Sequence, residues 1–316
     1  MDADFDIGLI IPFLNEEHGI PKLVEALNDE FKILEEKNLT GQIIFVDDGS
    51  TDNSYKILMD AKHVNYSAKI IRLSKNYGSH AAIRAGLLHS KAKFTTFMAA
   101  DLQEPFSLIY KLYQLCKKDH DIVWAARSSV SISFFDKITS RFFALLMRRF
   151  AFPSYPKKGF DMAMFNSQIK NHLNQNIESN SSIHLQIFSL GFNQATLYYN
   201  KAKRKVGKSK WTLSKKFKLF IDSFIAFSYA PIRFITTVGV FMFITGVIWT
   251  FYIVLRELIK GDLAQGWPTL SSILLIGFGV TNIALGIIAE YLWRTLDAAR
   301  KRPVFIIKDV TKITGE

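Results

Sequence analysis

The chain has 316 residues, which is enough for one large domain with an appendage or for two small domains. A net charge of +12 at pH 7 fits contact with nucleic acid or with an anionic membrane. The apolar residues that gather after Arg233 favour the membrane, so we expect no nucleic-acid partner. The single cysteine, Cys116, excludes an internal disulfide and a cysteine-based metal site.

From residue 5 to about 200, short apolar runs alternate with helical stretches such as Ile20–Lys37 and Ser79–Lys91. The first run follows an acidic start that lacks the basic region of a signal peptide, so we interpret it as a buried strand. The expected strands are Ile7–Phe13, Gln42–Val46, Lys69–Leu73 and Phe94–Ala100. Strands that alternate with helices predict an α/β fold with a mostly parallel sheet that helices cover on both faces.

Polar residues follow three of the expected strands. The first strand runs into Pro12–Glu17, the second ends in Asp47–Asp52, and the fourth ends in Asp101–Pro105. Each segment alone could be a turn or a helix cap. Because ligands of parallel sheets bind at the carboxyl ends of the strands, the three segments together predict one shared pocket.

Basic residues mark the segments that come next. Arg127 follows a further expected strand, and three cations then recur at spacings that place them on one face of a helix. They are Lys137, Arg141 and Arg148. The other side of this helix is aromatic, which suits a membrane interface. Lys203–Trp211 is a basic loop, and residues 213–232 predict a second amphipathic helix.

Phe234–Leu255 and Leu263–Ala289 contain no charged residue and no histidine. Each exceeds the ~20 residues that a helix needs to cross ~30 Å of hydrocarbon. Core helices of that length in soluble proteins keep a polar face, which these stretches lack. Basic residues flank both outer ends, whereas Arg256–Asp262 between the stretches is balanced in charge. The positive-inside rule therefore predicts two spans with both ends in the cytosol.

Four motifs in combination resemble those of inverting nucleotide-sugar glycosyltransferases. They are Pro12–Glu16, Asp47–Asp52, Leu73–Gly78 and Asp101–Pro105. More narrowly, the chain resembles the polyisoprenyl-phosphate glycosyltransferases of family 2, the group of dolichol-phosphate mannose synthase and the bactoprenol glucosyltransferases. The resemblance covers nearly the whole chain, including the paired apolar stretches. It implies a Rossmann-like glycosyltransferase type A fold, an interfacial amphipathic helix and two transmembrane helices.

This resemblance divides the chain into four parts. A cytosolic glycosyltransferase domain takes residues 1–212, and an amphipathic juxtamembrane helix takes residues 213–232. A two-helix anchor follows at 233–293, with spans at about 234–256 and 267–290, and residues 294–316 form a cytosolic tail. The expected location is the plasma membrane.

The resemblance also implies roles for the strand-end residues. Pro12, Glu16 and Asp48 would bind the base and ribose of the nucleotide, since carboxylates accept hydrogen bonds from ribose hydroxyls and base N–H groups. Asp101 would contact the nucleotide sugar and, with Gln103, hold Mg²⁺ or Mn²⁺, which neutralises the departing diphosphate. The family usually has an aspartate where this chain has Ala99, so a weakened or inactive enzyme is the alternative.

On the acceptor side, the resemblance implies that Arg127 and Arg141 bind the lipid phosphate, because guanidinium groups fit phosphate geometry. Asp101 and Arg127 would be the catalytic residues. Arg204 and Lys208 would close over the diphosphate, although a plain juxtamembrane basic run is the other interpretation. The role of Asp161 stays open, because relatives carry Gly-Asp-Phe-Arg where this chain has Gly-Phe-Asp.

The predicted function is inverting transfer of one sugar from a nucleotide sugar, by resemblance a uridine diphosphate sugar, to undecaprenyl phosphate. The product would serve cell-envelope biogenesis, in the modification of surface glycans, lipopolysaccharide or teichoic acid. The acceptor phosphate is already anionic at neutral pH, so none of the seven histidines is assigned as a base. A processive polysaccharide synthase is the rival, but the Gln-x-x-Arg-Trp element typical of that class is absent. The identity of the sugar and a homo-oligomeric state stay open.

Overall fold

The computed structural model describes residues 4–128, 144–149, 151–152, 155, 160–178, 181–200, 266–300 and 302–313, with single positions between 234 and 259. The chain forms two compact units. The first unit combines Met1–Ser223 with Pro303–Glu316, and the second is Phe224–Arg302. The predicted juxtamembrane helix at 213–232 lies outside the described residues.

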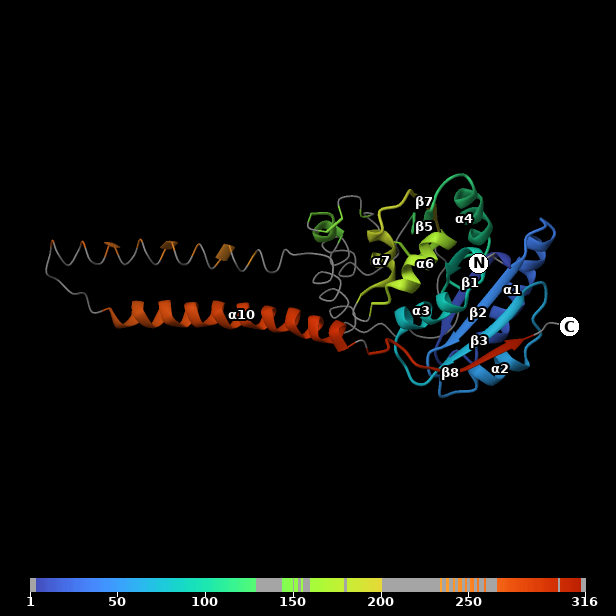
Figure 1. The fold of residues 1–316 in the computed structure, drawn as a ribbon, viewed down its shortest axis with the longest axis horizontal. Helices are drawn as coiled ribbons and strands as arrows, with labels where there is room; N and C mark the ends of the chain where they lie inside the picture. The colour runs from blue at the N-terminus through green and yellow to red at the C-terminus, as the bar shows by residue number, and fades with distance from the viewer. Residues whose placement is uncertain are drawn as a thin grey trace. The chain divides into compact units, whose positions relative to one another are not determined.

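An eight-stranded sheet runs through the first unit in the order β7-β5-β6-β4-β1-β2-β3-β8 (Figure 1). The strands are β1 (Phe5–Phe13), β2 (Gly41–Asp47), β3 (Ser67–Leu73), β4 (Ala92–Phe97), β5 (Ile122–Arg127), β6 (Met162–Asn166), β7 (Gln194–Tyr199) and β8 (Ile307–Ile313). The central strands β3, β2, β1 and β4 pair in parallel, whereas β6 and β8 are antiparallel to their neighbours. The predicted α/β fold is confirmed, but the sheet is mixed, and strands β6, β7 and β8 were not predicted.

Helices lie on both faces of this sheet. The helices of the first unit with assigned bounds are α1 (Ile20–Glu35), α2 (Ser54–Asp60), α3 (Ser79–His89), α4 (Leu108–Lys117), α6 (Ser167–Gln175) and α7 (Ile183–Ser189). Helices α1 and α2 pack together, and α3 packs with α6 and α7. Along the sheet, β2 lies beside β1 and β3 lies beside β2, whereas β4 lies on the opposite side of β1. Right-handed crossovers therefore place α3 on the face opposite to α1 and α2.

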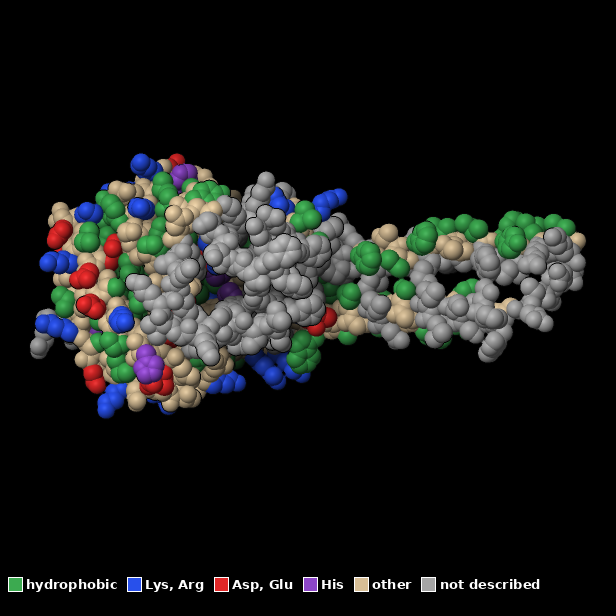
Figure 2. All heavy atoms as spheres, turned by 180° about the vertical axis from the view of Figure 1, so that it is seen from behind, with side chains coloured by type: hydrophobic (Ala, Val, Ile, Leu, Met, Phe, Trp, Pro, Cys, Tyr) green, Lys and Arg blue, Asp and Glu red, His purple; other side chains and the backbone are tan. Residues whose placement is uncertain are grey.

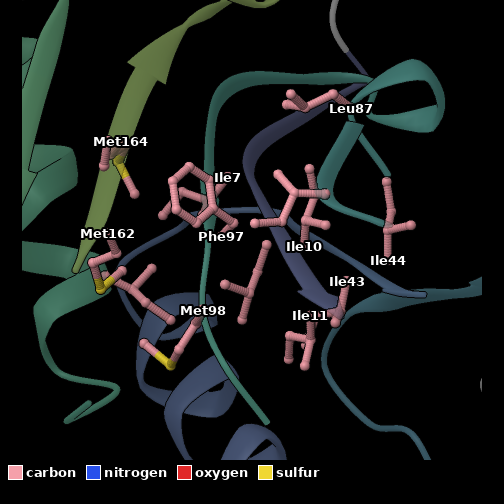
Figure 3. Close-up of a cluster of buried hydrophobic side chains, with 14 of the residues drawn as sticks. Ile7, Ile10, Ile11, Ile43, Ile44, Leu87, Phe97, Met98, Met162 and Met164 are labelled. Atoms are coloured by element: carbon pink, nitrogen blue, oxygen red, sulfur yellow. The ribbon is translucent and has the colours of Figure 1, made fainter. Parts of the chain in front are cut away.

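The core lies between the central strands and these helices. Figure 3 shows Ile7 and Ile10 of β1, Ile44 of β2 and Leu87 of α3 within one cluster of buried side chains. Parallel strands that are covered on both faces carry continuous apolar runs, which explains the unbroken burial of the middle of β1. Helix α3 sits close to β1, since a Cβ added at Gly86 would lie 2.4 Å from Cγ2 of Ile10.

The last strand, β8, returns to the edge of the sheet beside β3 (Figure 1). No strand was predicted for this segment, because its short alternating pattern gives a weak signal. Its pairing partner lies more than two hundred residues earlier in the chain. The first unit therefore contains the residues that precede Phe224 and those that follow Arg302.

The second unit contains the 34-residue helix α10 (Trp267–Arg300). Many of its large apolar side chains are exposed, as Figure 2 shows for the apolar surface of this unit. They include Leu270, Ile273, Leu274, Phe278, Leu285, Ile288, Leu292, Trp293 and Leu296. Among the residues that the structure describes, no helix has the combined length and apolar character that crossing a membrane requires, so the two predicted spans are not confirmed.

The close packing of α3 against β1 gives a test of the fold. We expect Gly86→Ala to destabilise the protein by about 1–3 kcal/mol, because the added methyl group has to displace Ile10 and β1. Thermal unfolding of the purified protein measures this. Gly277→Ala in α10 is the matched control, since a Cβ there meets no atom within 4 Å. Equal unfolding temperatures of the two variants would contradict the tight contact between α3 and β1.

Candidate active site

The loops that follow β1 and β2 are joined to each other at the carboxyl end of the sheet. Backbone N–H groups of each loop donate to side chains of the other. These bonds run from Asn15 N to Ser50 Oγ (3.0 Å), Glu16 N to Ser54 Oγ (2.7 Å), Glu17 N to Asp52 Oδ2 (3.2 Å), Thr51 N to Asn15 Oδ1 (2.8 Å) and Asn53 N to Glu17 Oε2 (3.1 Å). The Asn15–Glu17 backbone is therefore held against residues 50–54 of the segment that follows β2.

Asp48 joins a third loop to these two. Its carboxylate accepts hydrogen bonds from the backbone N–H groups of Tyr77 (2.7 Å) and Gly78 (2.9 Å), and its own N–H donates to the Phe13 carbonyl (3.0 Å). Burial raises the pKa of Asp48 to about 6, although the two N–H donors oppose this rise. The charge of neighbouring Asp47 adds to the rise. Asp48 thus changes its ionisation near pH 6 and is mostly ionised at pH 7.

Gly49 is the point where the loops after β2 and β3 touch. It has a φ of 79°, and an added Cβ would lie 2.6 Å from the carbonyl carbon of Lys75 and 2.7 Å from the nitrogen of Asn76. Both neighbouring atoms belong to the backbone, so neither can move aside cheaply. The sequence indicated only a turn here, and it is the approach of the third loop that requires glycine.

Asp47 precedes Asp48 at the end of β2 and is fully buried. One of its oxygens accepts a hydrogen bond from Ser50 N (2.7 Å), and the other faces Nε of Arg72 at 3.3 Å. The cation offsets a carboxylate charge that burial alone would make costly. Arg72 was not among the predicted site residues. The signal for it was weak, because Arg72 is one of two cations in β3 and the sequence does not distinguish it from Lys69.

Asp101 and Gln103 lie in the loop after β4, whose end is joined to β1 by a bond from Met98 N to the Ile10 carbonyl (2.9 Å). Both are half-buried. Leu102 between them has a φ of 57°, an uncommon conformation for leucine that turns the chain sharply here. No group of three or more His, Cys, Asp or Glu side chains suited to a metal occurs in the described part of the chain.

Arg127, at the end of β5, forms a two-pronged ion pair with Asp161. Its Nε lies 2.8 Å and 2.7 Å from the two carboxylate oxygens, and Nη2 also contacts Asp161. The hydroxyl of Tyr199 donates to the same carboxylate at 2.8 Å. This pairing raises the pKa of Arg127, which stays a cation. The predicted phosphate-binding arginine is thus fixed in orientation, and Asp161 is its partner.

Two buried histidines, His80 and His184, lie near Asp161, and the sequence predicted no role for them. The rings of His80 in α3 and His184 in α7 meet edge to face at 5.6 Å. Burial lowers the pKa of His80 to about 3 and lowers the pKa of His184 as well. Nε2 of His184 lies 3.2 Å from the Asp161 carbonyl oxygen. Both rings are neutral at physiological pH and help to pack α7 against the Arg127–Asp161 pair.

The remaining predicted residues fall into two groups. Pro12 is half-buried in β1 and pairs with Val46 of β2, next to the joined loops. Arg141, Arg204 and Lys208 lie outside the described residues, so their roles stay predictions.

Comparison with known proteins identifies related sequences over nearly the whole chain. Residues 9–181 match the family "Glycosyl transferase family 2", and residues 230–294 match "GtrB C-terminal hairpin". The chain is 28% identical over 309 residues to the uncharacterized glycosyltransferase YkcC of Bacillus subtilis (strain 168), with 98% of this chain and 95% of the relative covered.

A second relative carries a more specific name. The chain is 29% identical over 311 residues to the undecaprenyl-phosphate 4-deoxy-4-formamido-L-arabinose transferase of Proteus mirabilis (strain HI4320), covering 97% of this chain and 94% of the relative. Among solved structures, the glucosyl-3-phosphoglycerate synthase from Mycobacterium tuberculosis in complex with Mn²⁺, UDP and phosphoglyceric acid matches with a TM-score of 0.46. Its sequence identity is 15%, with 69% of this chain and 75% of that chain covered.

The loop contact at Gly49 gives a second test. Gly49→Ala and Gly191→Ala both place alanine at a positive φ, at a cost of about 1–2 kcal/mol each, but a Cβ at Gly191 meets no atom within 4 Å. We expect Gly49→Ala to lower the unfolding temperature several degrees further than Gly191→Ala, because only Gly49 touches another backbone. If the two variants unfold at the same temperature, the loops after β2 and β3 do not meet as described.

Proposed function

This chain belongs to glycosyl transferase family 2, and we propose that it transfers one sugar, with inversion, from a uridine diphosphate sugar to undecaprenyl phosphate. The observation that carries the proposal is the joining of three strand-end loops around Asp48, beside the loop of Asp101. The name of the Proteus mirabilis relative supports the lipid acceptor. The match of residues 230–294 to a C-terminal hairpin supports the same subgroup.

The donor binds where the loops after β1, β2 and β3 meet. Asp48 and Glu16 accept hydrogen bonds from the base and the ribose, and Pro12 lines the same end of the sheet. The oxygens of Asp48 each already accept one backbone N–H, which fixes their direction before the nucleotide arrives. A carboxylate held in this way binds without having to be ordered first.

Asp101 and Gln103 fit a divalent cation, because Mg²⁺ and Mn²⁺ take carboxylate and amide oxygens and complete their shell with phosphate oxygens and water. When bound, such an ion would neutralise the departing nucleotide diphosphate. Both residues are half-buried in the loop after β4. Ala99 is exposed in the same loop, so the donor set has one carboxylate fewer than the family pattern.

Transfer then needs no general base. An oxygen of the acceptor phosphate forms a bond to the anomeric carbon, and the bond from that carbon to the diphosphate breaks, so the electron pair leaves with the nucleotide. Arg127 orients the acceptor phosphate, with Arg141 as a second cation and with Arg204 and Lys208 at the diphosphate. The buried neutral His80 and His184 are consistent with this, since neither supplies charge to the site.

We place the enzyme at the plasma membrane with the first unit in the cytosol. Residues before Phe224 and after Arg302 belong to the same unit, so a segment that enters a bilayer between them has to return to the same side. The exposed apolar side chains of α10 and the basic residues at both flanks support a hairpin of this kind.

A panel of nucleotide sugars tests the function. The purified full chain is mixed with undecaprenyl phosphate, Mg²⁺ or Mn²⁺ and each nucleotide sugar in turn. With one of the UDP-sugars, it is expected to yield a lipid that carries a single sugar, detected by mass spectrometry. Asp101→Asn is expected to lower the rate about a hundredfold, because charge neutralisation at the leaving group is lost.

The control for Asp101→Asn is Asp119→Asn, which makes the same change at an exposed aspartate and is expected to leave the rate unchanged. Ala99→Asp in the same assay reports whether the missing carboxylate limits the enzyme, because a higher rate would reveal a weak metal site. No sugar transfer with any donor, or full activity of Asp101→Asn, would refute the proposal.

The ionisation of Asp48 predicts a pH dependence of donor binding. Because its pKa is raised to about 6, Asp48 is ionised above pH 6 and becomes protonated as the pH falls below it. We expect the Kd for the UDP-sugar donor to rise as the pH drops from 7 to 5, measured without the lipid acceptor, whose own phosphate changes charge near pH 6. Asp48→Asn should bind the donor weakly at every pH and lose this dependence. An Asp48→Asn variant with the wild-type profile would exclude Asp48 from the nucleotide site.

A further inference from the structure

A row of charged residues crosses three neighbouring strands below the nucleotide-binding loops. Asp47 of β2 is paired in register with Arg72 of β3, and Arg72 is paired in register with Asp309 of β8. Directly paired residues project from the same face of a sheet, so the cation lies between two carboxylates. The Nε of Arg72 lies 3.3 Å from the buried Oδ2 of Asp47.

Tyr55 of α2 covers this row. The guanidinium carbon of Arg72 lies 4.7 Å from the centre of the Tyr55 ring, a cation–π contact. The hydroxyl of Tyr55 donates to Oδ2 of Asp309 at 3.4 Å and lies 3.3 Å from Oγ1 of Thr311. Strand β8 thus holds Tyr55 at its hydroxyl, and the ring of Tyr55 holds Arg72.

At the other end of the row, Asp47 is joined by hydrogen bonds to the loops of the proposed donor site. Asp47 accepts the N–H of Ser50 at 2.7 Å, and Ser50 Oγ in turn accepts the N–H of Asn15 at 3.0 Å. Asp48 follows Asp47 directly in the chain. Without the cation, Asp47 would be a buried carboxylate with one hydrogen bond, next to a second carboxylate that has to stay ionised to bind the nucleotide.

We propose that Arg72 is a positioning residue for the donor nucleotide, and that β8 and Tyr55 hold it in place. This inference rests on the proposed function. The charge of Arg72 compensates the buried Asp47 carboxylate beside Asp48, so that Asp47 stays ionised and accepts the Ser50 N–H of the Asp48-Gly49-Ser50 turn. The strand that follows residues 224–302 is therefore part of the structure that prepares the nucleotide site.

The test measures nucleotide binding by the full chain in detergent, with UDP and GDP as probes in calorimetry. Arg72→Met is expected to weaken binding of the preferred nucleotide about tenfold or more, because a charge-assisted contact to a buried carboxylate is lost. Arg72→Lys keeps the charge without the planar group, and Tyr55→Phe keeps the ring without the hydroxyl. Both should weaken binding about two- to fivefold. The KM for undecaprenyl phosphate should stay within about twofold in all three variants.

Lys56→Met is the matched control, because it removes an equal charge from the exposed residue beside Tyr55 and should bind nucleotide as the wild type does. If Arg72→Met does not fold, Arg72→Lys and Tyr55→Phe decide the outcome. Wild-type affinity in those variants, or an equal loss of donor and lipid binding, would overturn the positioning role. A wild-type protein that binds neither UDP nor GDP would overturn the proposed function itself, and the inference with it.

Discussion

The carboxylate of Asp48 accepts one backbone N–H from Tyr77 and another from Gly78, while the backbone of Asp48 donates to the end of β1. These bonds tie together the loops that follow β1, β2 and β3. They favour the ionised carboxylate, whereas burial favours the neutral acid, and the balance leaves the pKa of Asp48 at about 6. The shape of the proposed donor site and the charge it presents therefore depend on the same few atoms.

The charges around this centre occur as pairs that different elements supply. Arg72 of β3 compensates Asp47 of β2, and Arg127 of β5 is held by Asp161, just before β6. Pairing permits charged groups to stay ionised away from water, and it fixes their directions. An arginine fixed in this way can orient a phosphate with little further loss of side-chain freedom. The acceptor side and the donor side of the proposed site are thus built on the same physical arrangement.

Much of the fold followed from local pattern. The continuous apolar runs predicted β1 to β4, and the carboxylates directly after them predicted that the loops at the strand ends lie together, because side chains at the ends of parallel strands meet at one edge. The loops of Glu16 and Asp48 are joined as expected. Strands β6, β7 and β8 were not predicted. Strand β8 lies at the edge of the sheet and alternates in polarity, and β6 is a buried run of only five residues between β5 and β4, too short to be told from a piece of helix.

The amino-acid sequence by itself determined which side chains stand at the strand ends, because that depends only on the order of residues along each strand. It could not determine which distant segments come into contact. The partnership of Arg127 with Asp161, the need for glycine at position 49 and the row from Asp47 to Asp309 all join residues that the chain order keeps apart. Only the tertiary structure decided them, because each depends on the register and spacing of strands that meet after the chain has folded.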